Sequence, residues 1–183
     1  MKLVVLAGPA GVGKGSLVKW ILANDPDFML SVSATTRAPR VGELDGVQYH
    51  FISKPEFEAG ISGDEFLEWA QVHNDNYYGT PRSELARAER EQKNLLLEID
   101  LQGARQVKLS HPDAIQIFIL PPSWDVLVER LRGRATETES EIATRLLTAR
   151  TELEAKGEFD FQLVNDELSL CAQEVIRIVK EAN

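Results

Sequence analysis

Three glycines precede a lysine in one short stretch of the chain. The stretch reads Gly8-Pro9-Ala10-Gly11-Val12-Gly13-Lys14-Gly15-Ser16. It follows an apolar run and leads into a segment with helical periodicity. Glycine-rich loops in this position direct backbone N–H groups at phosphate oxygens, and the lysine reaches the outer phosphates. The stretch therefore predicts a nucleoside triphosphate site with Lys14 as a catalytic residue.

The position after Lys14 departs from the strict form of this loop. Serine or threonine commonly supplies a hydroxyl for magnesium there, whereas this chain has Gly15 and then Ser16. The order Gly-Lys-Gly-Ser is like the loop of adenylate-kinase-type enzymes. Ser16 is therefore a candidate for contact with the metal or with a phosphate alone. The alternative, a solvated glycine-rich turn, is disfavoured because the glycines and the lysine stand in register behind an apolar strand.

Two arginines, Arg37 and Arg40, flank a proline in a hydroxyl-rich segment. Each guanidinium can bond bidentately to a phosphate dianion. Tyr49 follows nearby and also favours a phosphate-monoester site. The alternative is a pair of solvated surface arginines.

Glu68 lies within the apolar, strand-like run 66–70. A carboxylate among apolar neighbours is costly unless it faces a partner. The edge of guanine offers two adjacent N–H donors that one carboxylate can accept together, whereas adenine offers an acceptor and a donor. Glu68 therefore predicts recognition of guanine. We expect the next segment, 76–81, to form a turn that caps the following helix.

Glu98 and Asp100 stand two residues apart at the end of another apolar run. That spacing places both side chains on one face of a strand. Ligands bind at such strand ends in α/β sheets, where carboxylates can hold hydrated magnesium or orient a substrate. A charged strand terminus at the surface is the alternative.

Apolar runs at 3–7, 29–32, 95–99, 115–120 and 161–164 supply the strands that must position these residues. Continuous runs are typical of strands buried on both faces of a parallel sheet, and helical stretches between several of them indicate an α/β fold. The first helix is expected to bury Leu17, Ile21 and Leu22. The last is expected to bury Leu168, Cys171, Val175, Ile178 and Val179.

Two segments interrupt this alternation. In 33–80, residues 47–51 alternate like a half-buried antiparallel strand, and Ser53 with Glu56 predicts a capping box that opens a short helix. The second segment, 130–150, is rich in arginine and glutamate. Ser123 and residues 138–141 are expected to cap two helices there, joined by a polar link at 132–136.

Composition narrows the class of protein. A chain of 183 residues predicts one domain, and its net charge of −9 argues against general nucleic-acid binding. The single cysteine is expected in the core, and the three histidines lack metal-ligand spacing. Neither a signal peptide nor a membrane-spanning run is recognised, which favours a cytoplasmic location. The oligomeric state is not indicated.

In family order over nearly the whole length, these motifs resemble the guanylate kinase family. The motifs are the phosphate loop, residues 31–40, Gly42-Glu43, 68–70, 77–79, 98–103, the arginine-rich flap and Asn165-Asp166. The resemblance implies a single domain, 1–183, with a P-loop NTPase parallel-sheet core at 1–32, 81–123 and 156–183. It also implies a small inserted GMP-binding lobe of mixed strands at 33–80 and a helical lid at 124–155.

The resemblance implies transfer of the γ-phosphoryl group of ATP to GMP, and to dGMP, in purine nucleotide metabolism. The GMP site would consist of Ser33, Arg37, Arg40, Glu43, Tyr49, Glu68, Tyr78, Thr80 and Asp100. Ser33, Glu68 and Thr80 would read the guanine. ATP would contact residues 8–16, Arg134 and Asn165.

The flap arginines Arg130, Arg134 and Arg145, with Arg37, would surround the transferring group. Mg²⁺ would accompany ATP, with Ser16 and, through water, Glu98 as its protein contacts. The chain departs from the usual family pattern at Ala10, Ala34, Thr80, Glu98 and Ala135. Thr80 keeps the usual hydroxyl, and Glu98 keeps the usual charge on a side chain one methylene longer.

Two other functions fit parts of this pattern. Guanylate-kinase-like modules of scaffold proteins bind phosphopeptides, but they have generally lost the loop lysine and glycines that this chain keeps. Ribose-bisphosphate phosphokinases resemble guanylate kinases in sequence, but a sugar phosphate needs no reader of a base edge such as Glu68.

Overall fold

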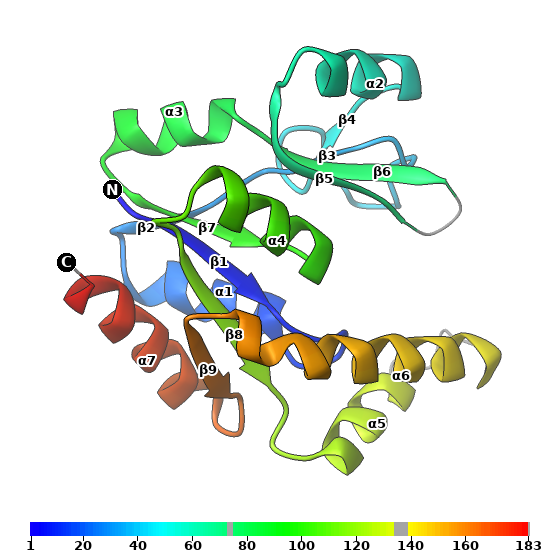
Figure 1. The fold of residues 1–183 in the computed structure, drawn as a ribbon, viewed down its shortest axis with the longest axis vertical. Coiled ribbons are helices and arrows are strands. Elements are labelled where there is room, and N and C mark those ends of the chain that lie inside the picture. The colour runs from blue at the N-terminus through cyan, green and yellow to red at the C-terminus, as the bar shows by residue number, and fades with distance from the viewer. Residues whose placement is uncertain (73–74, 134–138, 183) are drawn as a thin grey trace.

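The computed structural model describes residues 1–72, 75–133 and 139–182, and within them five parallel strands form the main sheet (Figure 1). In sheet order the strands are β2 (Phe28–Leu30), β7 (Asn94–Glu98), β1 (Leu3–Ala7), β8 (Ile115–Leu120) and β9 (Phe161–Val164). β1 lies at the centre and pairs in parallel with β7 and β8. The predicted parallel core is therefore confirmed.

Helices cover both faces of this sheet (Figure 1). They are α1 (Lys14–Asn24) and α7 (Leu168–Glu181) on one face, and α3 (Ser83–Glu91) and α4 (Leu101–Ser110) on the other. Successive side chains of β1 alternate between the faces. Val4 and Leu6 pack with α1 and α7, whereas Val5 packs with α3 and α4. Cys171 is buried on α7, as predicted.

Two predicted burial patterns are wrong in part. β9 is the edge strand, so it pairs with β8 alone, and Phe161 and Val164 are 40% and 52% exposed. A strand at an edge lacks a neighbour on one side, which leaves its side chains less covered than those of central strands. On α1, Leu17 and Ile21 are buried, but Leu22 is 37% exposed. Leu22 lies outside the buried apolar face of the helix.

A second sheet forms the lobe at the upper right of Figure 1. Its strands, in sheet order, are β4 (His50–Phe51), β3 (Ala34–Thr35), β6 (Asn76–Pro81) and β5 (Phe66–Val72). The sheet is mixed, because β3 runs parallel to β4 but antiparallel to β6. The mixed lobe is thus confirmed.

Local predictions within the lobe had different outcomes. The helix α2 (Lys54–Ser62) opens with the predicted capping box between Ser53 and Glu56. The strand predicted at 47–51 is shorter, since only His50 and Phe51 pair with β3, and the predicted antiparallel direction is wrong because this pairing is parallel. The prediction of a turn at 76–81 is wrong. These residues form β6, because cross-strand pairing with β5 outweighs the turn propensity of Asn, Gly and Pro.

The second interruption contains α5 (Trp124–Arg132), α6 (Glu139–Glu154) and the short 3₁₀ helix η1 (Ala155–Glu158). Ser123 caps α5 by accepting the backbone N–H of Val126 at 3.2 Å, as predicted. The predicted cap at 138–141 concerns side chains outside the described part. Within the described ranges, every helix is too short or too polar to span a membrane.

Candidate active site

The glycine-rich loop joins the end of β1 to the first turn of α1. Gly8, Gly11 and Gly13 have φ values of 144°, 84° and 97°, which residues with side chains rarely adopt. The Lys14 ammonium folds back over the loop and donates to the carbonyl oxygens of Gly8 and, at 3.3 Å, Pro9. Backbone carbonyl groups of the loop therefore hold the Lys14 ammonium in place.

Glu98, at the end of β7, lies against this loop. Its two carboxylate oxygens are 3.7 Å from the position that a Cβ on Gly15 would occupy, so the glycine leaves the acid close to the backbone. Glu98 and Ser16 line the same depression beside the loop. Glu98 is exposed at the end of its strand, but the protein packed beside its carboxylate still raises its pKa by desolvation, and Lys14 and Lys19 oppose that rise.

These side chains suit a cation that arrives with a nucleotide. The described residues contain no group of three His, Cys, Asp or Glu side chains able to hold a metal by themselves. One hydroxyl and one carboxylate beside a phosphate loop are the few oxygen groups that a largely hydrated Mg²⁺ takes from a protein. The donor set thus fits a metal shared with phosphate oxygens.

A cleft of about 450 Å³ lies between the phosphate loop, the end of the main sheet and the lobe. The predicted site residues that line it are Gly8, Ala10, Lys14, Ser33, Tyr49, Glu68, Tyr78, Glu98, Asp100 and Arg145. The fold therefore gathers into one cavity residues that lie more than a hundred positions apart in the sequence. Asp100 also caps α4 by accepting the N–H of Gly103 at 2.8 Å.

Glu68 projects from β5 into this cleft, although only 5% of it is exposed. Its Oε1 accepts the hydroxyl of Thr80 at 2.7 Å, and Thr80 is fully buried. Burial raises the pKa of Glu68 to about 7, the Thr80 hydrogen bond opposes that rise, and the charge of Asp100 adds to it. Thr80 therefore acts on the cleft by holding Glu68.

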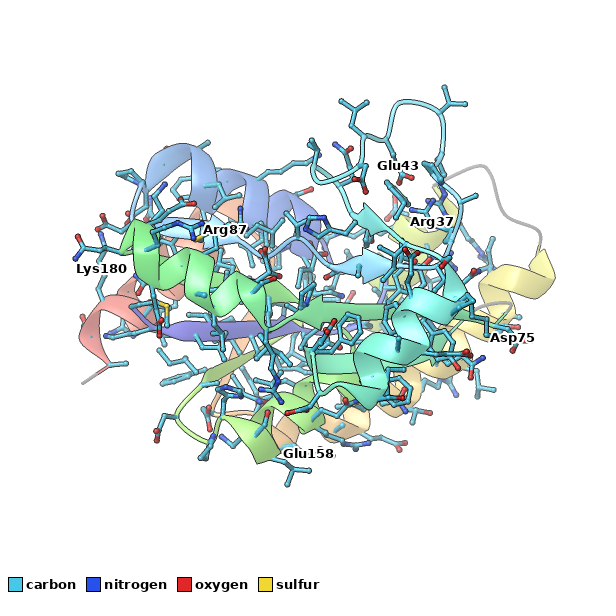
Figure 2. The ribbon with its side chains drawn as sticks, turned by 90° about the horizontal axis from the view of Figure 1, so that it is seen from above. Arg37, Glu43, Asp75, Arg87, Glu158 and Lys180 are labelled. Carbon is cyan, nitrogen blue, oxygen red and sulfur yellow. The ribbon has the colours of Figure 1, made fainter. Side chains whose placement is uncertain are left out.

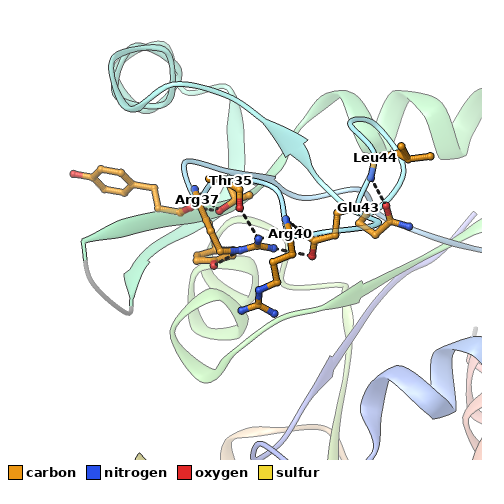
Figure 3. Close-up of polar contacts among 9 residues, drawn as sticks. Thr35, Arg37, Arg40, Glu43 and Leu44 are labelled. Carbon is orange, nitrogen blue, oxygen red and sulfur yellow. Dashed lines mark hydrogen bonds and ion pairs between the residues drawn. The ribbon is translucent and has the colours of Figure 1, made fainter. Parts of the chain in front are cut away.

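Arg37 and Glu43 form a two-pronged ion pair on the lobe (Figures 2 and 3). The Nη1 and Nη2 groups of Arg37 each donate to one Glu43 oxygen at 2.9 Å, and its Nε donates to the Tyr78 hydroxyl at 3.2 Å. Glu43 raises the pKa of Arg37, and Arg37 lowers that of Glu43. A carboxylate thus already occupies the fork that the sequence assigned to a phosphate.

Aromatic rings surround the same guanidinium. The Arg37 Cζ lies 5.4 Å from the centre of the Tyr49 ring and 5.7 Å from that of Phe51, within the range of cation–π attraction. Arg40 is on the same loop with an exposed side chain, and its backbone N–H donates to Glu43 at 2.7 Å (Figure 3). Glu43 therefore holds the side chain of Arg37 and the backbone of Arg40.

The helices α5 and α6 approach the phosphate loop from the other side. Leu127, Leu131 and Ala149 form a small apolar cluster against which Ala10 of the loop packs. Arg130 donates to the carbonyl oxygens of Val12 at 3.4 Å and Asn165 at 3.5 Å. Arg145 of α6 lines the cleft. Arg134 and Ala135, which the sequence also singled out, lie outside the described residues.

Asn165, after β9, is buried beside the phosphate loop. Its Nδ2 donates to the carbonyl oxygen of Val12 at 2.8 Å and lies 2.6 Å from where a Cβ on Gly13 would stand. Its backbone N–H donates to Leu120. Asn165 therefore supports the phosphate loop, which was predicted, like Asn165 itself, to contact ATP.

A family model described as guanylate kinase matches residues 1–182. The chain belongs to the guanylate kinase family. The guanylate kinase of Synechocystis sp. is 49% identical over 180 residues, which cover 98% of this chain and 94% of that protein. The guanylate kinase of Leifsonia xyli is 51% identical over 177 residues, covering 97% of this chain and 70% of that protein.

A crystal structure of guanylate kinase from Anaplasma phagocytophilum has the same fold. It matches with a TM-score of 0.74 and 32% identity, covering 98% of this chain and 84% of that one. Together with guanylate kinase relatives at about 50% identity, membership of this family makes the chain a nucleotide-binding kinase.

Some cleft residues of this guanylate kinase family member were not predicted. Thr144, Thr148 and Glu152 of α6 line the cleft at the i, i+4, i+8 spacing of one helix face. That spacing, in a helix carrying Arg145, is the signal that could have revealed them. Burial raises the pKa of Glu152, and Lys14 opposes the rise.

Proposed function

We propose that this protein transfers the γ-phosphoryl group of ATP to the phosphate of GMP, giving ADP and GDP. One observation carries the proposal: Lys14 of the phosphate loop and Glu68 of the lobe line the same cleft. A triphosphate held at the loop and a purine read by the lobe would therefore meet with their phosphates adjacent. Such an arrangement suits direct transfer between two nucleotides.

The donor half would consist of residues 8–16. Their backbone N–H groups and the α1 dipole favour phosphate oxygens, and Lys14 would exchange its bonds to Gly8 and Pro9 for bonds to the outer phosphates. Ser16 and Glu98 would hold hydrated Mg²⁺ between protein and phosphates. When bound, that cation would offset the charge that develops on the phosphate oxygens.

The acceptor half would be divided between base and phosphate. Ionised Glu68 would accept the ring N–H and the amino group of guanine, and Ser33 and Asp100 line the same cleft. Arg37, Tyr49 and Tyr78 would face the GMP phosphate. Because Glu43 occupies most of the Arg37 fork, we propose that Glu43 orients Arg37 and does not itself touch the phosphate.

The transfer step needs alignment and charge neutralisation more than covalent help from the protein. The GMP phosphate oxygen is already a competent nucleophile, so no general base is assigned. Arg130, Arg134 and Arg145 would move over the transferring group and exclude water, which would otherwise accept the phosphoryl group. We accordingly propose that residues 124–155 act as a lid, 33–80 as the GMP lobe, and the remainder as the core.

An acceptor screen tests the function. Purified protein with ATP and Mg²⁺ would be offered GMP, dGMP, AMP, UMP and ribose phosphates, and products would be separated by ion-exchange chromatography. GMP should be phosphorylated fastest, and dGMP should follow, since the assigned residues address base and phosphate and not the 2′-hydroxyl. Phosphorylation of AMP or a ribose phosphate at the GMP rate would contradict the proposal.

A further inference from the structure

Gly103, in the first turn of α4, lies directly against the carboxylate of Glu68. A Cβ placed on Gly103 would stand 2.4 Å from Glu68 Oε2, 3.0 Å from its Cδ and 3.3 Å from its Cγ. Ordinary contacts of a Cβ begin near 3.4 Å. The carboxylate therefore occupies space that is available only because residue 103 has no side chain.

Glu68 has little freedom to move elsewhere. Its other oxygen accepts the Thr80 hydroxyl at 2.7 Å, and the residue is 5% exposed. The pairing of β5 with β6 shifts between Phe66 and Glu68, and such irregularities re-aim the side chains next to them. Leu67 is anchored in the core on the α4 side of the main sheet. Both ends of the glutamate side chain are thus fixed.

Gln106, one turn further along α4, fixes the next residue of β5. Its Nε2 donates to the carbonyl oxygen of Trp69 at 2.7 Å, and its Oε1 accepts the Trp69 N–H at 3.1 Å. The side-chain amide therefore pairs with β5 as a neighbouring strand would. This pairing holds the β5 backbone at the distance from α4 at which Glu68 meets Gly103.

We propose that Gly103 is a positioning residue that sets selectivity for the 2-amino group of the acceptor base, with Gln106 holding the strand in place. The inference depends on the proposed role of Glu68 as the reader of guanine. A carboxylate that accepts two adjacent N–H donors must be aligned with both. A methyl group on Gly103 would overlap Glu68 Oε2 by about 1 Å and displace that oxygen by a similar distance. The displacement would break the contact with the 2-amino group before the contact with the ring N–H.

The test compares GMP with IMP, which keeps the ring N–H but lacks the amino group. In Gly103→Ala, the ratio of kcat/KM for GMP over IMP should fall about tenfold or more. The KM for ATP should stay within about twofold, because the phosphate loop is elsewhere. Thermal stability should fall, because the added methyl group overlaps a buried side chain that has little freedom to move, and the helix preference of alanine over glycine offsets only part of that cost. Gly157→Ala, where nothing lies within 4 Å, is the matched control.

Glu68→Gln separates this inference from the proposed function. If Glu68→Gln keeps the GMP over IMP ratio, the proposed reader is wrong. If Glu68→Gln loses the ratio but Gly103→Ala keeps it, only the role of Gly103 is wrong. In the double variant, Gly103→Ala should change the ratio less than about twofold further, because it acts through Glu68. Gln106→Leu should lower the ratio by a smaller factor, and an unchanged ratio there removes Gln106 from the proposal.

Discussion

Replacing Glu68 with glutamine should make the protein more stable at alkaline pH while it damages the site. The carboxyl pKa rises from 4.5 to about 7 on folding. Below pH 4.5 the folded and unfolded states both carry the proton, so the pKa shift does not change the unfolding free energy. As pH rises towards 7 the unfolded chain releases its proton while the folded protein keeps it, so the unfolding free energy falls. Above pH 7 the full penalty of about 3 kcal/mol remains.

Glutamine has nearly the same size and can still accept the Thr80 hydroxyl, but it carries no charge to bury. The unfolding free energy of the variant should therefore rise relative to that of the wild type by about 2–3 kcal/mol between pH 5 and pH 8. Urea unfolding of both proteins at these two pH values measures that difference. A difference between the proteins that stays constant with pH would refute the reasoning that burial perturbs this carboxyl group. The kinetic effect of the variant should appear in the kcat/KM for GMP and not in the KM for ATP.

Other perturbations address other parts of the site. Lys14→Ala should lower kcat by several orders of magnitude with an unchanged circular dichroism spectrum, whereas near-normal turnover would remove the lysine from catalysis. Glu43→Gln should raise the KM for GMP about fivefold to tenfold with little change for ATP, because Arg37 loses a charge-assisted partner. An equal effect on both substrates would contradict that orienting role. Asn165→Ala should raise the Kd of an ATP analogue about tenfold through loss of its bond to Val12, and fluorescence titration would measure the change.

The parallel core could be predicted because its signals are local and strong. Strands buried on both faces read as continuous apolar runs, and β1, β7 and β8 stand where such runs occur. β9 was mispredicted in burial because its position at the sheet edge depends on topology, which composition does not encode. β6 was mispredicted in type because its strand form depends on pairing with β5.

The candidate site was predictable to the extent that chemistry requires particular residue types. Lys14, Glu68 and Arg37 stand out because each is costly or unusual in its sequence context. The ion pair that occupies Arg37 was not predictable, since Glu43 reaches it only through the turn of the lobe loop. Gly103 carries no chemical group at all, so its contact with Glu68 is visible only in three dimensions.

The lobe sheet ends at β5, a strand whose outer side would otherwise present free backbone groups. Open strand edges recruit segments of other polypeptides and are a common origin of aggregation. At Trp69 the Gln106 amide pairs with both the backbone N–H and the carbonyl oxygen and closes the edge beside Glu68. A foreign peptide therefore finds no partner for strand addition at that point, even in a concentrated solution.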